Sequence, residues 1–214
     1  MATRQKDRPT RANGDVTREK ILNSAERLFG RRGFGLVSLR DITTDAGVTL
    51  ALASYHFGTK ENLFEQTVGR RASVMSALRE ERLAALQHPN VEQILDAFMA
   101  PLFERARSKE PGWRDYFRLL ARLGEDNQWL DLLETHFDRT ARLFHQALMQ
   151  AMPDADPGTV TRAFTMVLQV MLNTVSQHGR VDRLSTGAVK ATNLAEAYPV
   201  LLRFATAGME SFSR

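Results

Sequence analysis

The sequence contains no cysteine among its 214 residues, so disulfide bonds and thiolate metal sites are excluded. Its five histidines are too scattered to form a cluster of metal ligands. They are His56, His88, His136, His145 and His178. The sequence therefore predicts neither a metal nor a cofactor.

Long apolar runs are also missing. No stretch approaches the roughly 18 to 20 residues of a membrane span, and the basic N-terminus lacks the apolar segment of a signal peptide. We therefore expect a cytoplasmic protein that does not insert into a membrane. Nucleophile–base pairs, glycine-rich phosphate loops and metal-ligand spacings are absent too, so the sequence does not predict an enzyme.

No segment shows the sustained alternation of apolar and polar residues that indicates strands. Apolar residues instead recur at spacings of three and four, as in Ile21, Ala25 and Leu28. This pattern predicts an all-α fold of about nine helices. The expected helices cover residues 17–32, 39–46, 50–57, 60–87, 91–109, 113–123, 128–152, 157–178 and 193–212.

Two of the short helices have the capping and turn residues that are typical of a helix-turn-helix. Ser38 and Asp41 have the spacing of a capping box, and Thr49 can cap the helix that follows. Gly47 lies between the two helices, where glycine accepts a left-handed turn without a Cβ clash. The spacing and the turn together predict a DNA-binding unit.

The net charge of +4 is unevenly distributed. Residues 1–72 hold 13 Lys and Arg against 8 Asp and Glu, whereas residues 73–214 hold 16 against 17. A surplus in the N-terminal third favours the docking of a polyanion there. Residues 1–14 are basic and polar and predict a disordered arm, which either lies along phosphates or acts as a solubilising tail.

The segment from Ile21 to Phe64 resembles the DNA-binding domain of the TetR family of transcriptional regulators almost end to end. It reads ILNSAERLFGRRGFGLVSLRDITTDAGVTLALASYHFGTKENLF. Its ALASYHFGTK part is similar to a branch that reads A-x-x-x-Y-H-F-G-S-K, some members of which respond to fatty-acyl or other lipid-like molecules. Two positions depart from the family: Ala51 replaces a frequent glycine, and Ser54 replaces an aromatic or large apolar residue.

The resemblance implies a three-helix DNA-binding domain over residues 15–60 and a ligand-binding and dimerisation domain over residues 61–214. The recognition helix, Thr49 to Phe57, would enter the major groove. The residues expected to face outward are Leu50, Ala51, Ser54, Tyr55 and His56. Of these, Tyr55 and His56 serve either as DNA contacts or as packing and capping groups.

The resemblance also assigns base reading to Arg40, for which the alternative is a surface ion pair with Asp41 or Asp45. It places Lys60 and the two caps, Ser38 and Thr49, at phosphates. One such unit makes few specific contacts, so specific binding requires a dimer on a pseudo-palindromic operator.

The last two helices are the expected dimer interface, by analogy with the family, and the alternative is an intramolecular core. Their apolar stripes contain Val160, Phe164, Val167, Leu168, Met171 and Val175 in one helix and Leu194, Tyr198, Leu201, Leu202, Ala205 and Met209 in the other.

An effector site is expected between the DNA-binding end and these helices, where aromatic and methionine residues are frequent. The candidate ligand-binding residues are Phe103, Trp113, Phe117, Leu133, Phe137, Met166, Val170, Asn173 and Gln177. Their composition predicts a largely apolar effector. The sequence as a whole predicts a repressor that a small ligand releases from DNA, and the alternatives are an enzyme and an architectural DNA-binding protein.

Overall fold

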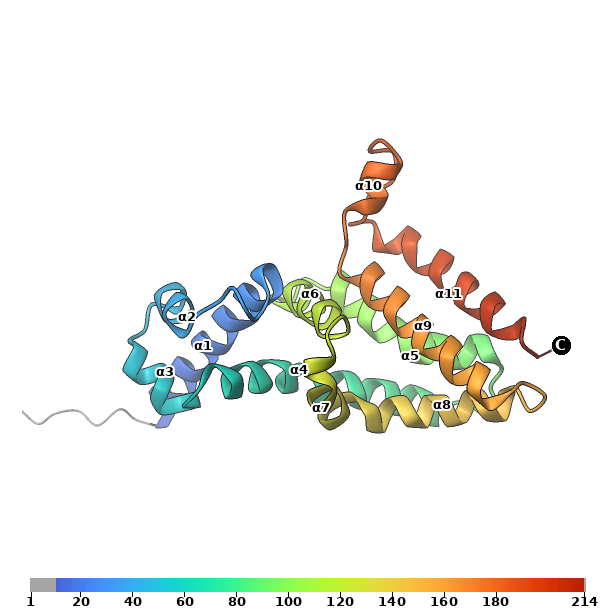
Figure 1. Ribbon diagram of the computed structural model, residues 1–214, viewed down its shortest axis with the longest axis horizontal. Coiled ribbons are helices and arrows are strands. Elements are labelled where there is room, and N and C mark those ends of the chain that lie inside the picture. Colours follow the sequence, from blue (N-terminus) through green and yellow to red (C-terminus); the bar gives the residue numbers. More distant parts are fainter. Residues whose placement is uncertain (1–10, 214) are drawn as a thin grey trace, which may run out of the picture.

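A computed structural model describes the backbone of residues 11–213 and the side chains from residue 13 onward. The described part is all-helical, with an N-terminal lobe and a longer C-terminal lobe (Figure 1). The N-terminal lobe comprises α1 (Arg11–Arg32), α2 (Leu39–Ala46), α3 (Leu50–Phe57) and the beginning of α4 (Lys60–Ala84). The all-α prediction is therefore confirmed for the described residues.

Short-range hydrogen bonds define α2 and α3 as the sequence predicts. The backbone amide of Asp41 donates to the Ser38 hydroxyl over 3.1 Å, and the Asp41 carboxylate accepts from the Ser38 amide over 2.8 Å. Gly47 ends α2 in the left-handed region with φ +66°. The Thr49 hydroxyl then accepts from the amide of Leu52 and begins α3.

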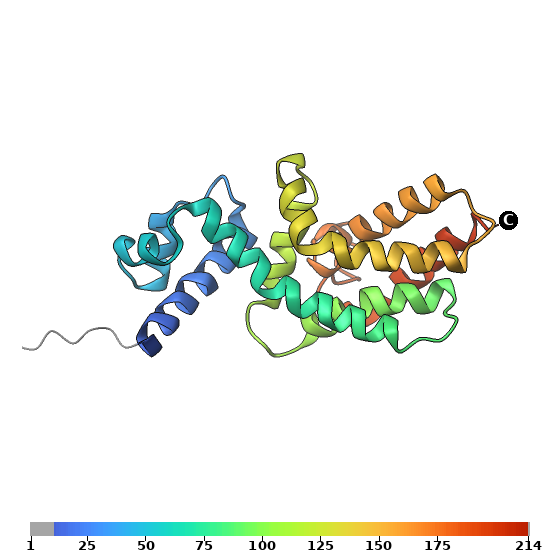
Figure 2. The ribbon, with the colours of Figure 1, turned by 90° about the horizontal axis from the view of Figure 1, so that it is seen from below.

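The long helix α4 joins the two lobes (Figure 2). The Thr59 hydroxyl caps it by accepting from the amide of Asn62 over 3.1 Å. The helix ends at Ala84, three residues before the predicted end. His88 has φ +47° directly before Pro89, where helical backbone is disfavoured.

The C-terminal lobe is a bundle around an aromatic core. It contains α5 (Val91–Arg107), α6 (Trp113–Leu123), α8 (Arg139–Ala151), α9 (Pro157–Val175) and α11 (Leu194–Glu210). The ring of Phe98 on α5 lies 4.9 Å from that of Phe144 on α8 and 5.4 Å from that of Phe164 on α9, both in edge-on geometry. This cluster joins three helices at the centre of the lobe.

Three further regions differ from the prediction. The first helix begins at Arg11 instead of Thr17, so residues 11–14 of the expected arm are helical, while residues 1–10 lie outside the described residues. The helix predicted over residues 128–152 is divided into η1 (Asn127–Trp129), α7 (Leu130–Leu133), a π-helical turn η2 (Glu134–Asp138) and α8. The periodic pattern predicts an uninterrupted α-helix and does not account for the π turn, whose hydrogen bonds join residues five positions apart.

The third difference is α10 (Arg180–Leu184), a short helix that protrudes from the bundle between α9 and α11 (Figure 1). The sequence predicts a loop there because Gly179 and Gly187 flank it. A helix of this length is too short for a periodic apolar pattern. The Asp182 carboxylate accepts from the amide of Ala191 over 2.8 Å and closes the protrusion.

Candidate DNA-binding surface and effector region

The outer face of α3 is exposed as predicted for a recognition helix. Ala53 and Phe57 are buried against the lobe, which turns Leu50 and Ser54 toward solvent. Tyr55 is 82% exposed and makes no packing contribution to the core, whereas His56 is half-buried. The remaining predicted contact, Ala51, is exposed as well.

Leu52 is 40% exposed on the same helix, and the sequence analysis did not single it out. The sequence could have indicated its exposure, because Leu52 lies between the outward Ala51 and the inward Ala53. A half-exposed leucine at the edge of this face adds apolar surface for contact with thymine methyl groups.

Arg40 projects from the first turn of α2 and is exposed. Among the described residues it forms no ion pair, because Asp41 is occupied by the Ser38 cap and Asp45 pairs with Arg27. The hydrogen bonds from Ser38 lower the pKa of the Asp41 carboxyl, which keeps the cap ionised. The alternative role of Arg40, a surface ion pair with Asp41 or Asp45, is therefore not observed among the described residues.

Lys60 has an internal partner that the sequence did not indicate. Its ammonium group donates to the carbonyl of Phe34 over 3.1 Å and lies 4.0 Å from the centre of the Phe34 ring. An ammonium group has three donors, so two of them remain for other acceptors. The two capping residues, Ser38 and Thr49, are exposed.

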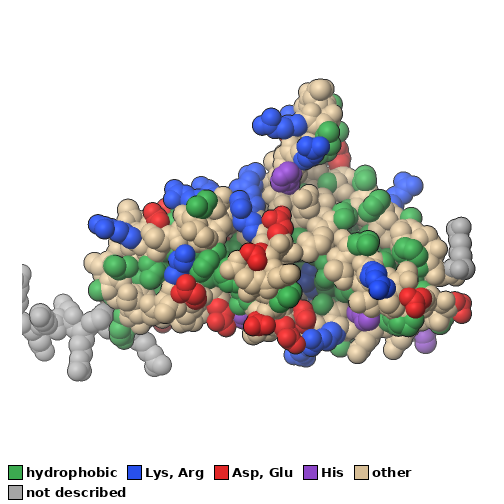
Figure 3. Space-filling view, in the orientation of Figure 1, with side chains coloured by type: hydrophobic (Ala, Val, Ile, Leu, Met, Phe, Trp, Pro, Cys, Tyr) green, Lys and Arg blue, Asp and Glu red, His purple; other side chains and the backbone are tan. Residues whose placement is uncertain are grey.

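Lys and Arg side chains gather along the upper side of the N-terminal half in Figure 3, over the region of α1, α2 and α6. Asp and Glu side chains also gather on the lower side near α7, where other Lys or Arg side chains lie beside them. The basic side chains on the upper side of the N-terminal half would attract a polyanion.

A buried ion pair lies where the two lobes meet. The Arg71 guanidinium on α4 donates to both carboxylate oxygens of Glu26 on α1, over 2.7 and 3.1 Å. It also donates to the carbonyl of Pro111 over 2.9 Å and lies 4.4 Å from the centre of the Trp113 ring. One side chain therefore connects α1, α4 and the loop before α6.

Burial raises the pKa of Glu26 above its ordinary value. The hydrogen bond from Arg71 and the positive charges of Arg70 and Arg71 oppose that rise only in part. Gly112 in the adjacent loop has φ +92°, and a Cβ there would lie 2.2 Å from the Glu26 carboxylate and 2.3 Å from the Arg71 guanidinium. Only glycine fits this position.

Helices α1 and α6 also approach each other closely. A Cβ on Gly30 of α1 would lie 2.2 Å from the carbonyl oxygen of Asp115 on α6. The Tyr116 hydroxyl, also on α6, donates to the carbonyl of Val68 on α4 over 3.0 Å. Helix α6 is therefore in direct contact with α1 and α4, and a displacement of α6 would act on both helices.

The candidate ligand-binding residues do not form a single site. Phe103, Trp113 and Phe117 belong to the filled core, where the rings of Trp113 and Phe117 are stacked 5.6 Å apart. Leu133 and Phe137 are half-buried along α7 and η2. The others lie along α9 or just after it: Met166, Val170 and Asn173 are exposed, and Gln177 is half-buried with φ +59°.

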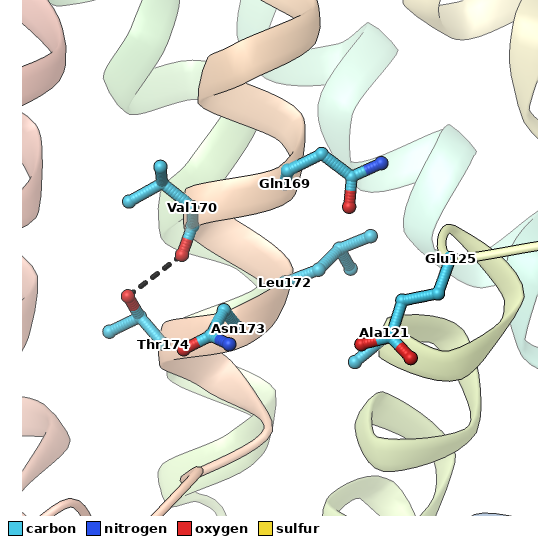
Figure 4. Close-up of a pocket in the computed structure, with 7 residues that line it drawn as sticks. All are labelled: Ala121, Glu125, Gln169, Val170, Leu172, Asn173 and Thr174. Carbon is cyan, nitrogen blue, oxygen red and sulfur yellow. Dashed lines mark hydrogen bonds between the residues drawn. The ribbon is translucent and has the colours of Figure 1, made fainter. Parts of the chain in front are cut away.

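Two of those residues do line a common groove, between the end of α6 and α9 (Figure 4). It has a volume of about 350 Å³ and is lined by Ala121, Glu125, Gln169, Val170, Leu172, Asn173 and Thr174. The Gln169 amide donates to the carbonyl of Gly124 over 3.1 Å and connects its two sides. The groove is open to solvent, and Glu125, Gln169 and Asn173 supply polar groups to it.

The apolar stripes expected at the dimer interface face the interior of the chain instead. Val160, Val175, Leu194 and Met209 are at most 2% exposed, and the other stripe residues are buried or half-buried. The exposed apolar residues of these helices lie on other faces, with Met166 at 65%, Val200 at 70% and Phe204 at 67%. Periodicity in the sequence identified the buried apolar face of each helix but not the exposed apolar face.

No group of three His, Asp or Glu side chains in residues 11–213 is arranged to hold a metal ion. None of the helices in that range combines the length and the hydropathy that crossing a membrane requires.

The sequence matches known families at both ends. Residues 21–67 match the bacterial regulatory proteins of the tetR family, and residues 96–208 match the tetracyclin repressor-like C-terminal domain. The transcriptional repressor BepR of Brucella suis biovar 1 (strain 1330) is 33% identical over 97 residues, 45% of this chain and 46% of BepR. The regulator BetI of Agrobacterium fabrum (strain C58 / ATCC 33970) is 30% identical over 111 residues, 44% of this chain and 54% of BetI. The match thus spans about half the length of these relatives.

Solved structures share the fold at low sequence identity. HlyIIR, a hemolysin II transcriptional regulator, superposes with a TM-score of 0.61 and 15% identity over 94% of this chain and 99% of its own. FadR from Bacillus halodurans, a fatty acid degradation regulator, gives a TM-score of 0.62 and 14% identity over 92% and 97%. Since the C-terminal match alone covers more than half of the sequence, the chain belongs to the TetR family of regulatory proteins.

Proposed function

We propose that this protein is a ligand-responsive transcriptional repressor that binds a pseudo-palindromic operator in the cytoplasm as a homodimer. A small, largely apolar effector, with fatty-acyl-like molecules as one class, releases it from DNA. The observation that carries the proposal is the capped helix α3, whose Leu50, Ser54 and Tyr55 are exposed near an Arg40 that forms no ion pair among the described residues. A capped helix with a free arginine beside it suits the major groove.

The proposed contacts divide into two kinds. Arg40 reads a base edge, where a guanidinium can bond guanine O6 and N7 together, while Leu50 and Ala51 contact thymine methyl groups. Lys60 and the caps Ser38 and Thr49 lie at phosphates and set the register. Ser54, Tyr55 and His56 complete the surface with hydrogen bonds to phosphates or bases.

The proposed dimer uses the outer faces of α9 and α11. Met166 and Val170 on α9, and Val200 and Phe204 on α11, are exposed at helical spacing. Two copies related by a twofold axis would bury these faces in a four-helix arrangement. This face replaces the inward stripes that the sequence suggested.

The proposed transmission of the effector signal runs through α4 and α6. A ligand shifts DNA affinity only if it binds one conformation better than the other. Movement of α6 would act on α1 through the close approach at Gly30, and on α4 through the bonds of Arg71 and Tyr116. Both helices lead to the lobe that carries α3. The relatives support regulation as the outcome, since BepR is named a repressor and FadR a regulator of fatty acid degradation.

The test is a mobility-shift measurement on genomic fragments selected by the protein itself, in a salt series with excess competitor DNA. A discrete shift of dimer size should survive the competitor and weaken as salt rises, because neutralised phosphates release counterions. Equal loss of the shift with every competitor would support an architectural protein instead.

A further inference from the structure

Arg79 occupies an inward position of α4 in the C-terminal lobe. Val68, Ala72 and Met75 precede it on the same buried stripe, and Arg79 itself is only 6% exposed. It lies between Phe98 on α5 and Met171 on α9. A charged side chain thus stands where the helix pattern calls for an apolar one.

All hydrogen bonds that Arg79 forms within the described residues go to neutral acceptors. Its Nε donates to the carbonyl of Phe98 over 2.8 Å, and one terminal nitrogen lies 3.9 Å from the sulfur of Met171. The guanidinium carbon is 3.7 Å from the centre of the Phe98 ring. A thioether is a weak acceptor, so most of the five guanidinium donors lack a strong partner.

No carboxylate of the described residues lies within ion-pair distance of Arg79, in contrast to other arginines of α4. Arg71 pairs with Glu26, and Arg82 pairs with Glu104 over 2.6 Å at the surface. Burial lowers the pKa of Arg79 to about 9, which leaves the group charged at neutral pH. A buried charge without a counter-charge is unfavourable.

We propose that Arg79 is the counter-charge for an anionic effector, a carboxylate on an apolar body, which deepens the proposed function and rests on it. The carboxylate would accept two hydrogen bonds from the terminal guanidinium nitrogens in place of Met171. The apolar body would pack against the aromatic cluster of Phe98, Phe144 and Phe164. Methionine changes rotamer easily, so Met171 can move aside for it.

The test compares ligands with matched tails on the whole protein. Octanoate, decanoate, dodecanoate and 4-phenylbutyrate are each paired with the corresponding alcohol, and binding is measured by calorimetry and by the shift in Tm. At least one carboxylate should raise the Tm of the wild type and bind at least tenfold more tightly than its alcohol. Arg79→Met should lose this tenfold preference, while Arg79→Lys should keep part of it.

Arg82→Met is the matched control, because Arg82 lies three residues further along α4 in an exposed ion pair. It should keep the wild-type preference for carboxylates. Without ligand, Arg79→Met should have a Tm at or above that of the wild type, since it removes an uncompensated charge. The proposal is overturned if no carboxylate binds better than its alcohol, or if Arg79→Met and Arg82→Met behave alike.

Operator binding without ligand separates this proposal from the function on which it rests. Wild type and Arg79→Met should both bind the operator, and only the wild type should be released by the carboxylate. If neither binds DNA while the carboxylate preference depends on Arg79, the repressor function fails and the anion site stands. If both bind DNA and the carboxylate releases them equally, the anion site fails and the repressor stands.

Discussion

Arg71 and Glu26 form a two-point ion pair that joins α4 to α1 inside the junction between the lobes, with N···O distances of 2.7 and 3.1 Å. Both residues are buried, so the pair is specific in geometry and sensitive to the loss of either partner. Together with the close approach of Gly30 to Asp115, it links α1 to the C-terminal lobe.

Removing one member of this pair should be costly. Glu26→Ala leaves the buried Arg71 guanidinium without its two hydrogen-bonded carboxylate oxygens, with the exposed Glu110 carboxylate 3.6 Å away as its remaining ion-pair partner. We expect this change to lower the free energy of unfolding by about 3 to 5 kcal/mol. The exposed pair of Arg142 and Glu134 is the control, and Glu134→Ala should cost at most about 1 kcal/mol. Urea unfolding measures both, and equal effects would contradict a structural role for the buried pair.

The raised pKa of Glu26 has a defined consequence for stability. The pKa of Glu26 in the folded state lies above the ordinary value of 4.5, so the folded protein binds the proton of this carboxyl more tightly than the unfolded chain does. The stabilisation that results from this tighter proton binding is fully present below pH 4.5 and is lost as pH rises through the folded-state pKa. The stability of the wild type relative to Glu26→Gln should therefore fall as pH rises from 4.5. Urea midpoints of both proteins across this range check the sign, and a rising difference would be inconsistent with it.

Two glycines in different surroundings should respond differently to alanine. Gly112→Ala adds a Cβ at φ +92° against Glu26 and Arg71, and we expect a loss of more than about 1 kcal/mol. Gly14→Ala lies within α1 with its nearest neighbour at 4.0 Å, and it should gain about 0.5 to 1 kcal/mol. Thermal unfolding of the two variants would refute the close packing of the junction if both changed in the same direction.

Arg40→Ala should weaken operator binding by about 1 to 3 kcal/mol and relax specificity at one position of each half-site. Tyr55→Ala should weaken binding without loss of fold, since Tyr55 is 82% exposed. Arg142→Ala, in the C-terminal lobe, is the control for a general change of charge. Mobility shifts on single-base operator variants measure these effects, and an unchanged specificity profile in Arg40→Ala would assign Arg40 to the phosphates.

Phe204→Glu on α11 should convert the dimer to a monomer, because it places a charge in the centre of an apolar interface. Leu130→Glu is the matched control, with a leucine that is 57% exposed on α7, which is not part of the proposed face. Light scattering after size exclusion gives the molar mass of each. A dimer that persists in Phe204→Glu would move the interface elsewhere on the chain.

The sequence by itself determined the local structure of the DNA-binding lobe. The caps Ser38, Thr49 and Thr59, the left-handed Gly47 and the boundaries of α2 and α3 all follow from hydrogen bonds between residues at most five positions apart. Such interactions depend on the order of residues alone, and the same local pattern carries the family resemblance that both family matches confirm.

Only the tertiary structure decided which face of each C-terminal helix is inside. Helices α9 and α11 are apolar on more than one face, so periodicity indicates the stripes but not which of them a neighbouring helix covers. The same holds for the arginines of α4: only packing shows that Arg71 pairs with Glu26 and that Arg79 contacts no carboxylate of the described residues. Partners that are distant in sequence are selected by packing in three dimensions, because no local interaction encodes them.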